Sequence, residues 1–248
     1  MARRSRWAVP GQMHQLMLRG NNGQCVFQDD EDRALWLDLA AREAAHHRVD
    51  VHAYVLLPAR VQVLVTPHEA SSLSRWMQAL GRSYVRRFNQ RHGRSGTLWE
   101  GRFRGGVLQA PRYALACMVF FDALPVWEGL VDAPADWPWS SHRHFVGHRV
   151  DKWLRPHATV WDLGNTPFAR EAAYARLVQT GLSHDLWRAL TDHAMFGWPL
   201  GDAAFLQHIQ SVLGAPVQRR AAGRPKRLKP AEPHASSLDE AEGSPPAR

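Results

Sequence analysis

The chain has 248 residues, of which 45% are hydrophobic and 22% are charged. This composition is typical of a globular protein with a core, and the length accommodates one domain of about 150 residues with an extension. No apolar run reaches the roughly 18–20 residues of a membrane-spanning helix, and no apolar segment follows the basic N-terminus, so neither a transmembrane helix nor a secretory signal is expected. Two distant cysteines, Cys25 and Cys117, favour neither a disulfide framework nor a cysteine zinc site, which predicts a cytoplasmic location.

The net charge is the first functional indication. Lys and Arg number 31 against 23 Asp and Glu, a net charge of +8, and most of the basic residues are arginine. The planar guanidinium binds phosphates bidentately and stacks on bases, so the excess indicates a nucleic-acid partner. A codon bias toward arginine is the alternative. The last 18 residues hold four acids and one base, so the rest of the chain carries +11.

The predicted elements alternate between strands and helices. In chain order they are a strand at 12–18, a helix from the acids at 29–32 to about 47, strands at 49–57 and 61–65 in a hairpin, a long helix at 71–91, a short strand at 106–110 and a helix at 111–124. This succession predicts an α+β fold, a ferredoxin-like antiparallel sheet with helices on one face. It occupies residues 8–145, followed by a helical extension at 150–215 and a basic, then acidic, disordered tail at 216–248.

Several short motifs occur in a characteristic order along the predicted domain. They are Pro10-Gly11, Arg19-Gly20-Asn21, Asp30-Glu31-Asp32-Arg33, the segment 52–58 (HAYVLLP), the segments 73–78 (LSRWMQ) and 84–89 (YVRRFN), the segment 96–103 (GTLWEGRF), Leu124-Pro125-Val126 and the segment 136–141 (DWPWSS). Each is weak alone, but their order and spacing resemble the REP-associated tyrosine transposases, a single-tyrosine branch of the HUH transposases.

The resemblance implies a ferredoxin-like sheet that binds single-stranded DNA hairpins. Active members cleave DNA with a tyrosine hydroxyl, while a His-x-His pair holds a divalent metal such as Mg²⁺. Residues i and i+2 of a strand face the same side, so two such histidines can share one ion. The metal polarises a phosphate oxygen and the tyrosinate attacks phosphorus.

The chain departs from this pattern at the catalytic positions. Arg60 and Gln62 stand where the family has its histidines, Phe120 stands at the tyrosine, and Leu124 replaces a polar residue before a proline. Arginine has no lone pair to donate and glutamine offers only a carbonyl, so no metal cofactor is expected. Arg60 has two interpretations that stay open. Either its guanidinium holds a phosphate in place of the metal ion, or arginine arose by neutral substitution at a position that no longer has to bind metal.

Other tyrosines and histidines of the chain could supply replacement chemistry. Tyr113 lies two helical turns before Phe120 but matches an ordinary aromatic of the family at that helix start, and Tyr54 lies on a strand that alternates into the core. Both are alternative nucleophiles, but neither is expected to replace the family's tyrosine. His142 with His144, and the adjacent pair at 46–47, lie outside the family's site. Without a cysteine or carboxylate at ligand spacing, these histidines are interpreted as solvent-exposed or phosphate-adjacent.

The DNA-binding residues are predicted to be intact. They are Arg75, Arg82, Arg86, Arg87, Arg91, Arg94, Arg102 and Arg104, interleaved with Trp76, Tyr84, Phe88, Trp99 and Phe103. Arginines among stackable rings are typical of single-strand and hairpin binders. The alternative is that Trp76, Tyr84 and Phe88 are the core stripe of a long helix, which leaves the segment 91–104 to contact phosphates. Arg224, in Gly223-Arg224-Pro225, resembles an AT-hook core.

Together these features predict a nucleoid-associated DNA-binding protein, related to DNA transposition and recombination, that recognises hairpin or repeat single-stranded DNA without cleaving it. Two alternatives stay open: an active metal-dependent transposase or endonuclease with displaced catalytic residues, and an RNA-binding module. A membrane partner is not expected, and a homodimer is left open.

Overall fold

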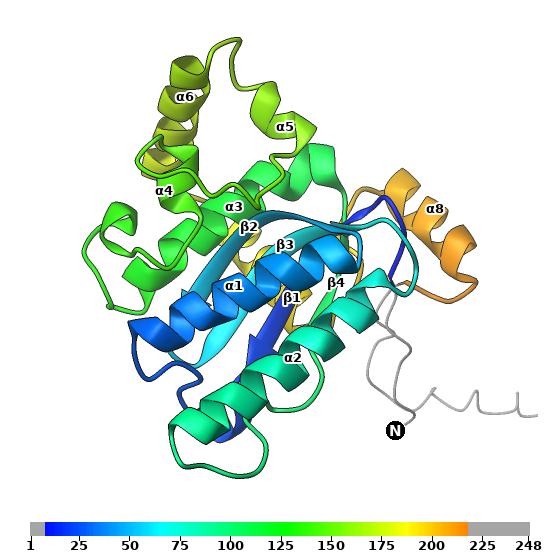
Figure 1. The fold of residues 1–248 in the computed structure, drawn as a ribbon. Coiled ribbons are helices and arrows are strands. Elements are labelled where there is room, and N and C mark those ends of the chain that lie inside the picture. The colour runs from blue at the N-terminus through cyan, green and yellow to red at the C-terminus, as the bar shows by residue number, and fades with distance from the viewer. Residues whose placement is uncertain (1–7, 218–248) are drawn as a thin grey trace, which may run out of the picture. The chain divides into compact units, whose positions relative to one another are not determined.

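Four strands form one antiparallel sheet in the computed structural model, which describes residues 8–217 (Figure 1). They are β1 (Met13–Arg19), β2 (Val49–Leu57), β3 (Arg60–Pro67) and β4 (Arg104–Leu108), in the spatial order β2-β3-β1-β4. All three neighbouring pairs are antiparallel. Helical crossovers join β1 to β2 and β3 to β4, which gives the ferredoxin-like arrangement. The predicted α+β class is confirmed.

The helices follow from caps and apolar periodicity. They are α1 (Asp30–His46), α2 (Ser72–Arg91), α3 (Ala110–Trp127), α4 (His142–Phe145), α5 (Ala158–Trp161), α6 (Pro167–Thr180), α7 (His184–Phe196) and α8 (Ala203–Leu213), with 3₁₀ turns at Asn21–Gly23 and Pro134–Asp136. The Asp29 side chain caps α1 by accepting a hydrogen bond from the Asp32 amide. None of the helices within residues 8–217 is long and apolar enough to cross a membrane.

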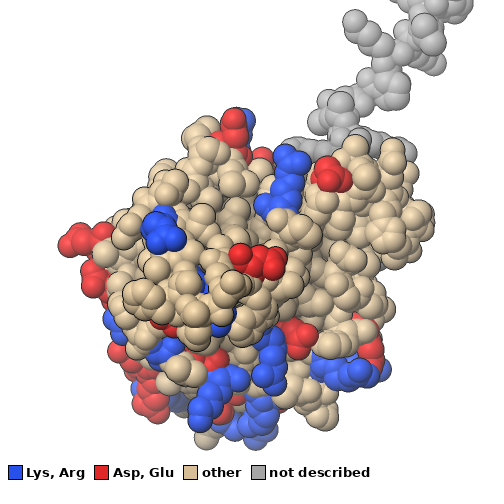
Figure 2. Space-filling model, turned by 90° about the horizontal axis from the view of Figure 1, so that it is seen from above, with Lys and Arg blue, Asp and Glu red and all other residues tan. Residues whose placement is uncertain are grey.

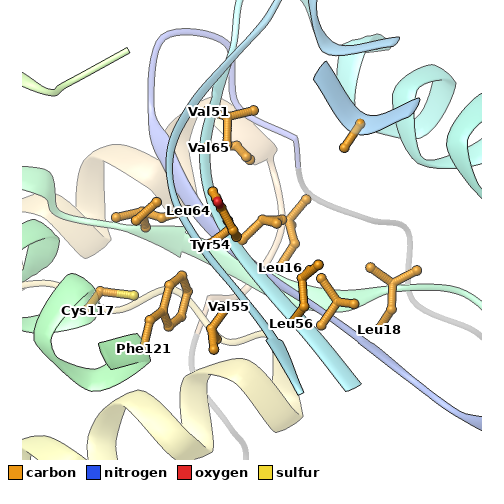
Figure 3. Close-up of a cluster of buried hydrophobic side chains, with 14 of the residues drawn as sticks. Leu16, Leu18, Val51, Tyr54, Val55, Leu56, Leu64, Val65, Cys117 and Phe121 are labelled. Carbon is orange, nitrogen blue, oxygen red and sulfur yellow. The ribbon is translucent and has the colours of Figure 1, made fainter. Parts of the chain in front are cut away.

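Helices cover both faces of the sheet, so the prediction of helices on one face is wrong. On β1, Leu18 lines a cavity together with residues of α2, whereas its neighbour Met17 lines another cavity with residues of α3 and α7. Consecutive side chains of a strand point to opposite faces, so α2 and the pair α3 and α7 lie on opposite sides. Figure 3 shows Cys117 and Phe121 of α3 beside the strands.

The extension is part of the same compact unit as the sheet. Helix α7 packs against β4 and β1, and Leu200 forms an isolated parallel bridge with Leu108. Farther along, Ile209 and Val217 are buried against Val107 of β4. Helix α7 therefore shares the second face of the sheet with α3. Val107 points to the opposite face, because its neighbour Gly106 faces His193 of α7, so Ile209 and Val217 pack at the β4 edge on the side of α2.

Several element ends differ from their predicted positions by one to three residues, and the fourth strand and α3 show the physical reasons. The fourth strand lies at 104–108 instead of 106–110, because Gly105 and Gly106 pair with Leu16 and Gln15 of β1. Helix α3 continues past Pro125 to Trp127 instead of ending at 124. A proline lacks the N–H that bonds one turn back, which usually ends a helix, but here only the last turn is affected.

Candidate nucleic-acid interface

The four positions that match the family's catalytic residues meet around one cavity. Arg60 and Gln62 lie two residues apart on β3, and Phe120 and Leu124 lie one turn apart on α3. All four line a cavity of about 310 Å³, which Trp187 of α7 also borders. The motif spacing therefore selected residues that the fold brings together.

Contacts within the chain occupy the polar groups of this cavity. Arg60 forms an ion pair with Glu128, and the Gln62 Oε1 accepts a hydrogen bond from the Gln15 Nε2 at 2.8 Å. The Phe120 ring lies edge-on to Trp187, with 4.8 Å between centroids. A paired guanidinium, an amide whose oxygen already has a donor and two hydrocarbon side chains do not fit a divalent metal. Within residues 8–217, no cluster of three or more His, Cys, Asp or Glu side chains is placed to hold one.

Three of the chain's four tyrosines are buried and donate to internal acceptors. Tyr54 donates to the Asp151 carboxylate at 2.8 Å, Tyr84 to the Val26 carbonyl at 2.5 Å, and Tyr174 to the Asp122 carboxylate at 2.6 Å. Burial raises the pKa of each of these hydroxyls above its ordinary value, which disfavours the nucleophilic tyrosinate. Tyr113, at the start of α3, lies outside the set of residues that line the cavity.

A row of arginines follows one face of α2. Arg75, Arg82 and Arg86 are spaced by seven and four residues, which places their side chains on one side of the helix. All three are exposed, and none of them pairs with a carboxylate in the described part of the chain. We call these three residues the arginine face. Arg87, on the flank of α2, and Arg102, in the loop before β4, are also exposed and without a carboxylate partner among residues 8–217.

Three other predicted DNA-binding arginines are held by side chains of the chain itself, which weakens the case for the whole segment 91–104 as a phosphate contact. The Arg94 guanidinium donates to the Gln24 Oε1 at 2.7 Å, and that of Arg104 donates to the Glu100 carboxylate at 3.0 Å. Arg91 bridges three carboxylates at the start of α1, each with a nitrogen–oxygen distance of 2.7 Å: Asp29, Glu31 and Asp32. Arg91 thus ties the end of α2 to the beginning of α1.

The aromatic residues divide into two groups. Trp76, Tyr84 and Phe88 are buried, as the core-stripe alternative predicted. Trp99 and Phe103 are only partly buried, and both line a second cavity of about 440 Å³ between α2 and the loop before β4. Arg75 and Arg102 border the same cavity. We call it the α2 cavity.

Sequence reasoning missed several residues of the α2 cavity. Ser74, Gln78 and Gly81 line it from α2. Serine and glutamine on an exposed helix face carry no distinctive pattern. A glycine in a helix interior is unfavourable, so Gly81 was the one signal available.

The interpretation of His142 and His144 as solvent-exposed is wrong. His142 is buried, and its Nδ1 lies 2.9 Å from the Asp122 carboxylate. The Nδ1 of His144 accepts a hydrogen bond from the Asp151 amide at 3.3 Å, and burial lowers the pKa of this imidazole. Arg224 lies outside the described residues. In the view of Figure 2, charged side chains of both signs gather along one side, and much of the remaining surface is uncharged.

Comparisons with known proteins give limited similarity. No family model and no curated protein matches the chain. One similar solved structure is a REP-associated tyrosine transposase bound to a REP hairpin, with 18% identity and a TM-score of 0.48, covering 64% of this chain and 93% of that one. Another is a candidate transposase from Deinococcus radiodurans, also 18% identical, with a TM-score of 0.32 and coverage of 47% and 91%. At these values neither similarity assigns the chain a family or an activity.

Proposed function

We propose that this protein binds hairpin or repeat single-stranded DNA through the arginine face, and that it does not cleave the strand. The observation that carries the proposal is the set of exposed guanidinium groups without carboxylate partners at Arg75, Arg82 and Arg86. Arginines that already pair with acids lose part of their attraction for phosphate, whereas these retain it. The choice of hairpin DNA as the ligand rests on the resemblance of the sequence motifs to the REP-associated tyrosine transposases.

The groups at the first cavity support the proposed absence of cleavage. Transfer of a phosphodiester to the protein needs an oxygen nucleophile beside a group that stabilises charge on the phosphate. Phe120 has no hydroxyl, and the two arginines that line the cavity, Arg60 and its cross-strand neighbour Arg19, pair with Glu128 and Glu100. Of the two interpretations of Arg60, its ion pair favours a structural role over phosphate binding.

The binding test replaces the arginine face. A triple variant with Arg75→Ala, Arg82→Ala and Arg86→Ala should bind DNA hairpins more weakly, whatever their nucleotide sequence. The slope of log affinity against log salt should become shallower by roughly 2 to 3, because each lost phosphate contact contributes about 0.7 to 0.9. Fluorescence anisotropy at several salt concentrations measures both quantities.

The matched control removes three exposed arginines from the extension: Arg155→Ala, Arg176→Ala and Arg188→Ala. It changes the net charge equally but should leave the salt slope near that of the parent. Equal slopes for the two triple variants would refute the arginine face as the interface. Preference for the same hairpin made of RNA would favour an RNA-binding module instead.

The cleavage test looks for a covalent product. Incubation with a hairpin that carries single-stranded flanks, in Mg²⁺ or Mn²⁺, should give no protein–DNA adduct on a denaturing gel, because Phe120 lacks an attacking oxygen. A phosphotyrosine-linked adduct would contradict the proposal. Loss of that adduct in Tyr113→Phe would identify the displaced nucleophile.

A further inference from the structure

A third cavity lies beside α6 and shares no residue with the arginine face. It has a volume of about 420 Å³ and is lined by residues of α4, of α6 and of the 3₁₀ turn Pro134–Asp136. Figure 1 shows α4 and α6 next to each other, and the two helices are in contact. The volume lies within the range of about 300–1,000 Å³ that is typical of small-ligand sites. We call it the α6 cavity.

Most of the wall of the α6 cavity is apolar. Val146, next to α4, and Ala172, Ala175 and Val178 of α6 line it. Phe168 borders it too, although this residue is 79% exposed. An exposed aromatic ring beside a wall of small apolar residues leaves hydrophobic surface in water, and a ligand with an apolar body would cover that surface.

His142 presents an unpartnered ring nitrogen at this cavity. The residue is 6% exposed and lines the cavity. Its Nδ1–H donates to the Asp122 Oδ2 at 2.9 Å, and the Tyr174 hydroxyl donates to the same oxygen. With the proton on Nδ1, the lone pair of a neutral imidazole lies on Nε2, and no described residue forms a hydrogen bond with that nitrogen. A buried acceptor, held in one orientation by a carboxylate, is therefore available to a ligand.

Glu171 of α6 adds a carboxylate to the same cavity. It is half-buried, and no Lys or Arg among residues 8–217 pairs with it. A Cβ atom at residue 147 would lie 2.5 Å from the Glu171 Oε2, so Gly147 leaves the carboxylate its room. The charge acts on the nearby imidazole of His144, but burial lowers the pKa of that imidazole, which keeps it neutral at pH 7. The carboxylate thus keeps its negative charge beside an apolar wall.

These two polar groups decide the chemical class of the ligand. The His142 Nε2 and the Glu171 carboxylate are both acceptors, so the ligand must supply donors. A carboxylate or phosphate would be repelled by Glu171, and a neutral alcohol would leave its charge uncompensated. An ammonium group carries a positive charge and three N–H donors, which suffice for both acceptors. The apolar wall accommodates the rest of such a molecule.

We propose that the α6 cavity binds a small primary amine with an apolar body, whose ammonium group donates to the Glu171 carboxylate and to the His142 Nε2. The inference does not rest on the proposed DNA binding, because the cavity contains no member of the arginine face. It gives the protein a small-molecule site in addition to its DNA-binding surface.

The test titrates the full chain at pH 7 with 2-phenylethylamine, and in parallel with 2-phenylethanol and 3-phenylpropionate, which have similar bodies but a neutral or a negative end. Isothermal titration calorimetry measures the affinities. The amine should bind at least about tenfold more tightly than the alcohol, because charge-assisted hydrogen bonds are stronger than neutral ones. The carboxylate probe should bind more weakly than both.

Glu171→Gln should remove the preference for the amine over the alcohol without lowering the melting temperature, because the carboxylate pairs with no cation in the described chain. Ala175→Leu should weaken the binding of both probes, because leucine fills the cavity, and it tests the site independently of Glu171. The matched control Glu69→Gln removes an exposed carboxylate outside the cavity and should keep the preference.

Equal affinities of the wild-type protein for the amine and the alcohol would overturn the inference. So would an unchanged preference in Glu171→Gln, unchanged affinities in Ala175→Leu, or no binding of any probe. Each of these results would leave the proposed DNA binding standing, because hairpin affinity is measured separately and should be the same in all three variants.

Discussion

At the scale of single residues, nearby carboxylates decide what each arginine does. Arg86 and Arg91 lie on the same helix only five residues apart. Arg91 reaches the acidic start of α1 and is held there by three carboxylates, whereas Arg86 has no carboxylate partner in residues 8–217. Sequence alone places both in one basic stretch. Only the packing of α2 against α1 separates an arginine held by carboxylates from one without such partners.

The Arg91 contact predicts a pH-dependent stability. Its hydrogen bonds to Asp29 lower the pKa of that carboxyl from 3.8 to about 2. A carboxyl with a depressed pKa in the folded state stabilises the protein above its unfolded pKa, and this contribution disappears as the pH falls through the folded value. Asp29→Asn keeps a side chain able to cap α1 but removes the charge.

The expected result is a lower melting temperature for Asp29→Asn than for the wild type at pH 5 to 7, with the difference shrinking as the pH falls from 3.8 toward 2. Thermal unfolding followed by circular dichroism at several pH values measures it. Asp185→Asn, at an exposed ion pair with Arg188, is the control and should show little difference at any pH. A pH-independent difference for Asp29→Asn would contradict the assignment.

At the scale of elements, a buried polar cluster joins the extension to the first domain. Asp122 of α3 accepts hydrogen bonds through one oxygen from Tyr174 of α6 and from His142 of α4, and its other oxygen has no partner in the described chain. Burial raises the pKa of this carboxyl. Removing one of these two donors leaves the buried carboxyl group with a single hydrogen bond, which makes its burial more costly.

Tyr174→Phe should therefore lower the free energy of unfolding by about 1–3 kcal/mol, the usual range for the loss of a buried hydrogen bond to a carboxyl group. Urea denaturation measures this change. The matched variant Tyr113→Phe removes a hydroxyl at the only partly buried start of α3 and should leave stability near that of the wild type. If the two variants unfold alike, the extension is not held to α3 through this cluster.

The helices and strands also show how far the sequence predicts the fold. Strands of apolar and β-branched residues and the long helix α2 are placed within one or two residues, because local periodicity determines them. The side of the sheet that each helix covers depends on tertiary packing. Met17 and Leu18 point to opposite faces of the sheet and both are buried, so neither face is open to solvent at β1. The residue sequence of β1 does not show, however, that α7 covers one of these faces.

For the candidate site, motif spacing identifies Arg60, Gln62, Phe120 and Leu124, which line one cavity. The spacing could not reveal that Arg60 pairs with Glu128, because that partner lies on another element. The α2 cavity was missed for the same reason, since its walls come from segments that meet only in the folded chain. Composition predicts that arginines bind phosphate, but it cannot show which of them are free to do so.

At the scale of the whole molecule, the compact unit ends at Gln218, and the last apolar residue buried in it is Val217. Residues 219–248 contain seven basic and four acidic side chains, so deleting them lowers the net charge from +8 to +5. The melting temperature should not change, because the deletion stops short of Val217 and its neighbours. Long-range attraction to DNA should weaken modestly, since much of the basic charge remains.

Hairpin affinity after this deletion should fall by at most about tenfold, or about 1.4 kcal/mol, because the arginine face remains in place. If the segment around Arg224 acts as a minor-groove hook, the loss should appear on hairpins with A·T-rich duplex flanks and not on isolated hairpins. Anisotropy titrations with both substrates separate these cases.

A shorter chain that ends at residue 208 serves as the control for the melting temperature: it loses Ile209 and Val217 from the apolar cluster with Val107 and should melt at a lower temperature. Complete loss of hairpin binding in the chain that ends at residue 218 would place recognition in the tail and contradict the arginine face as the interface.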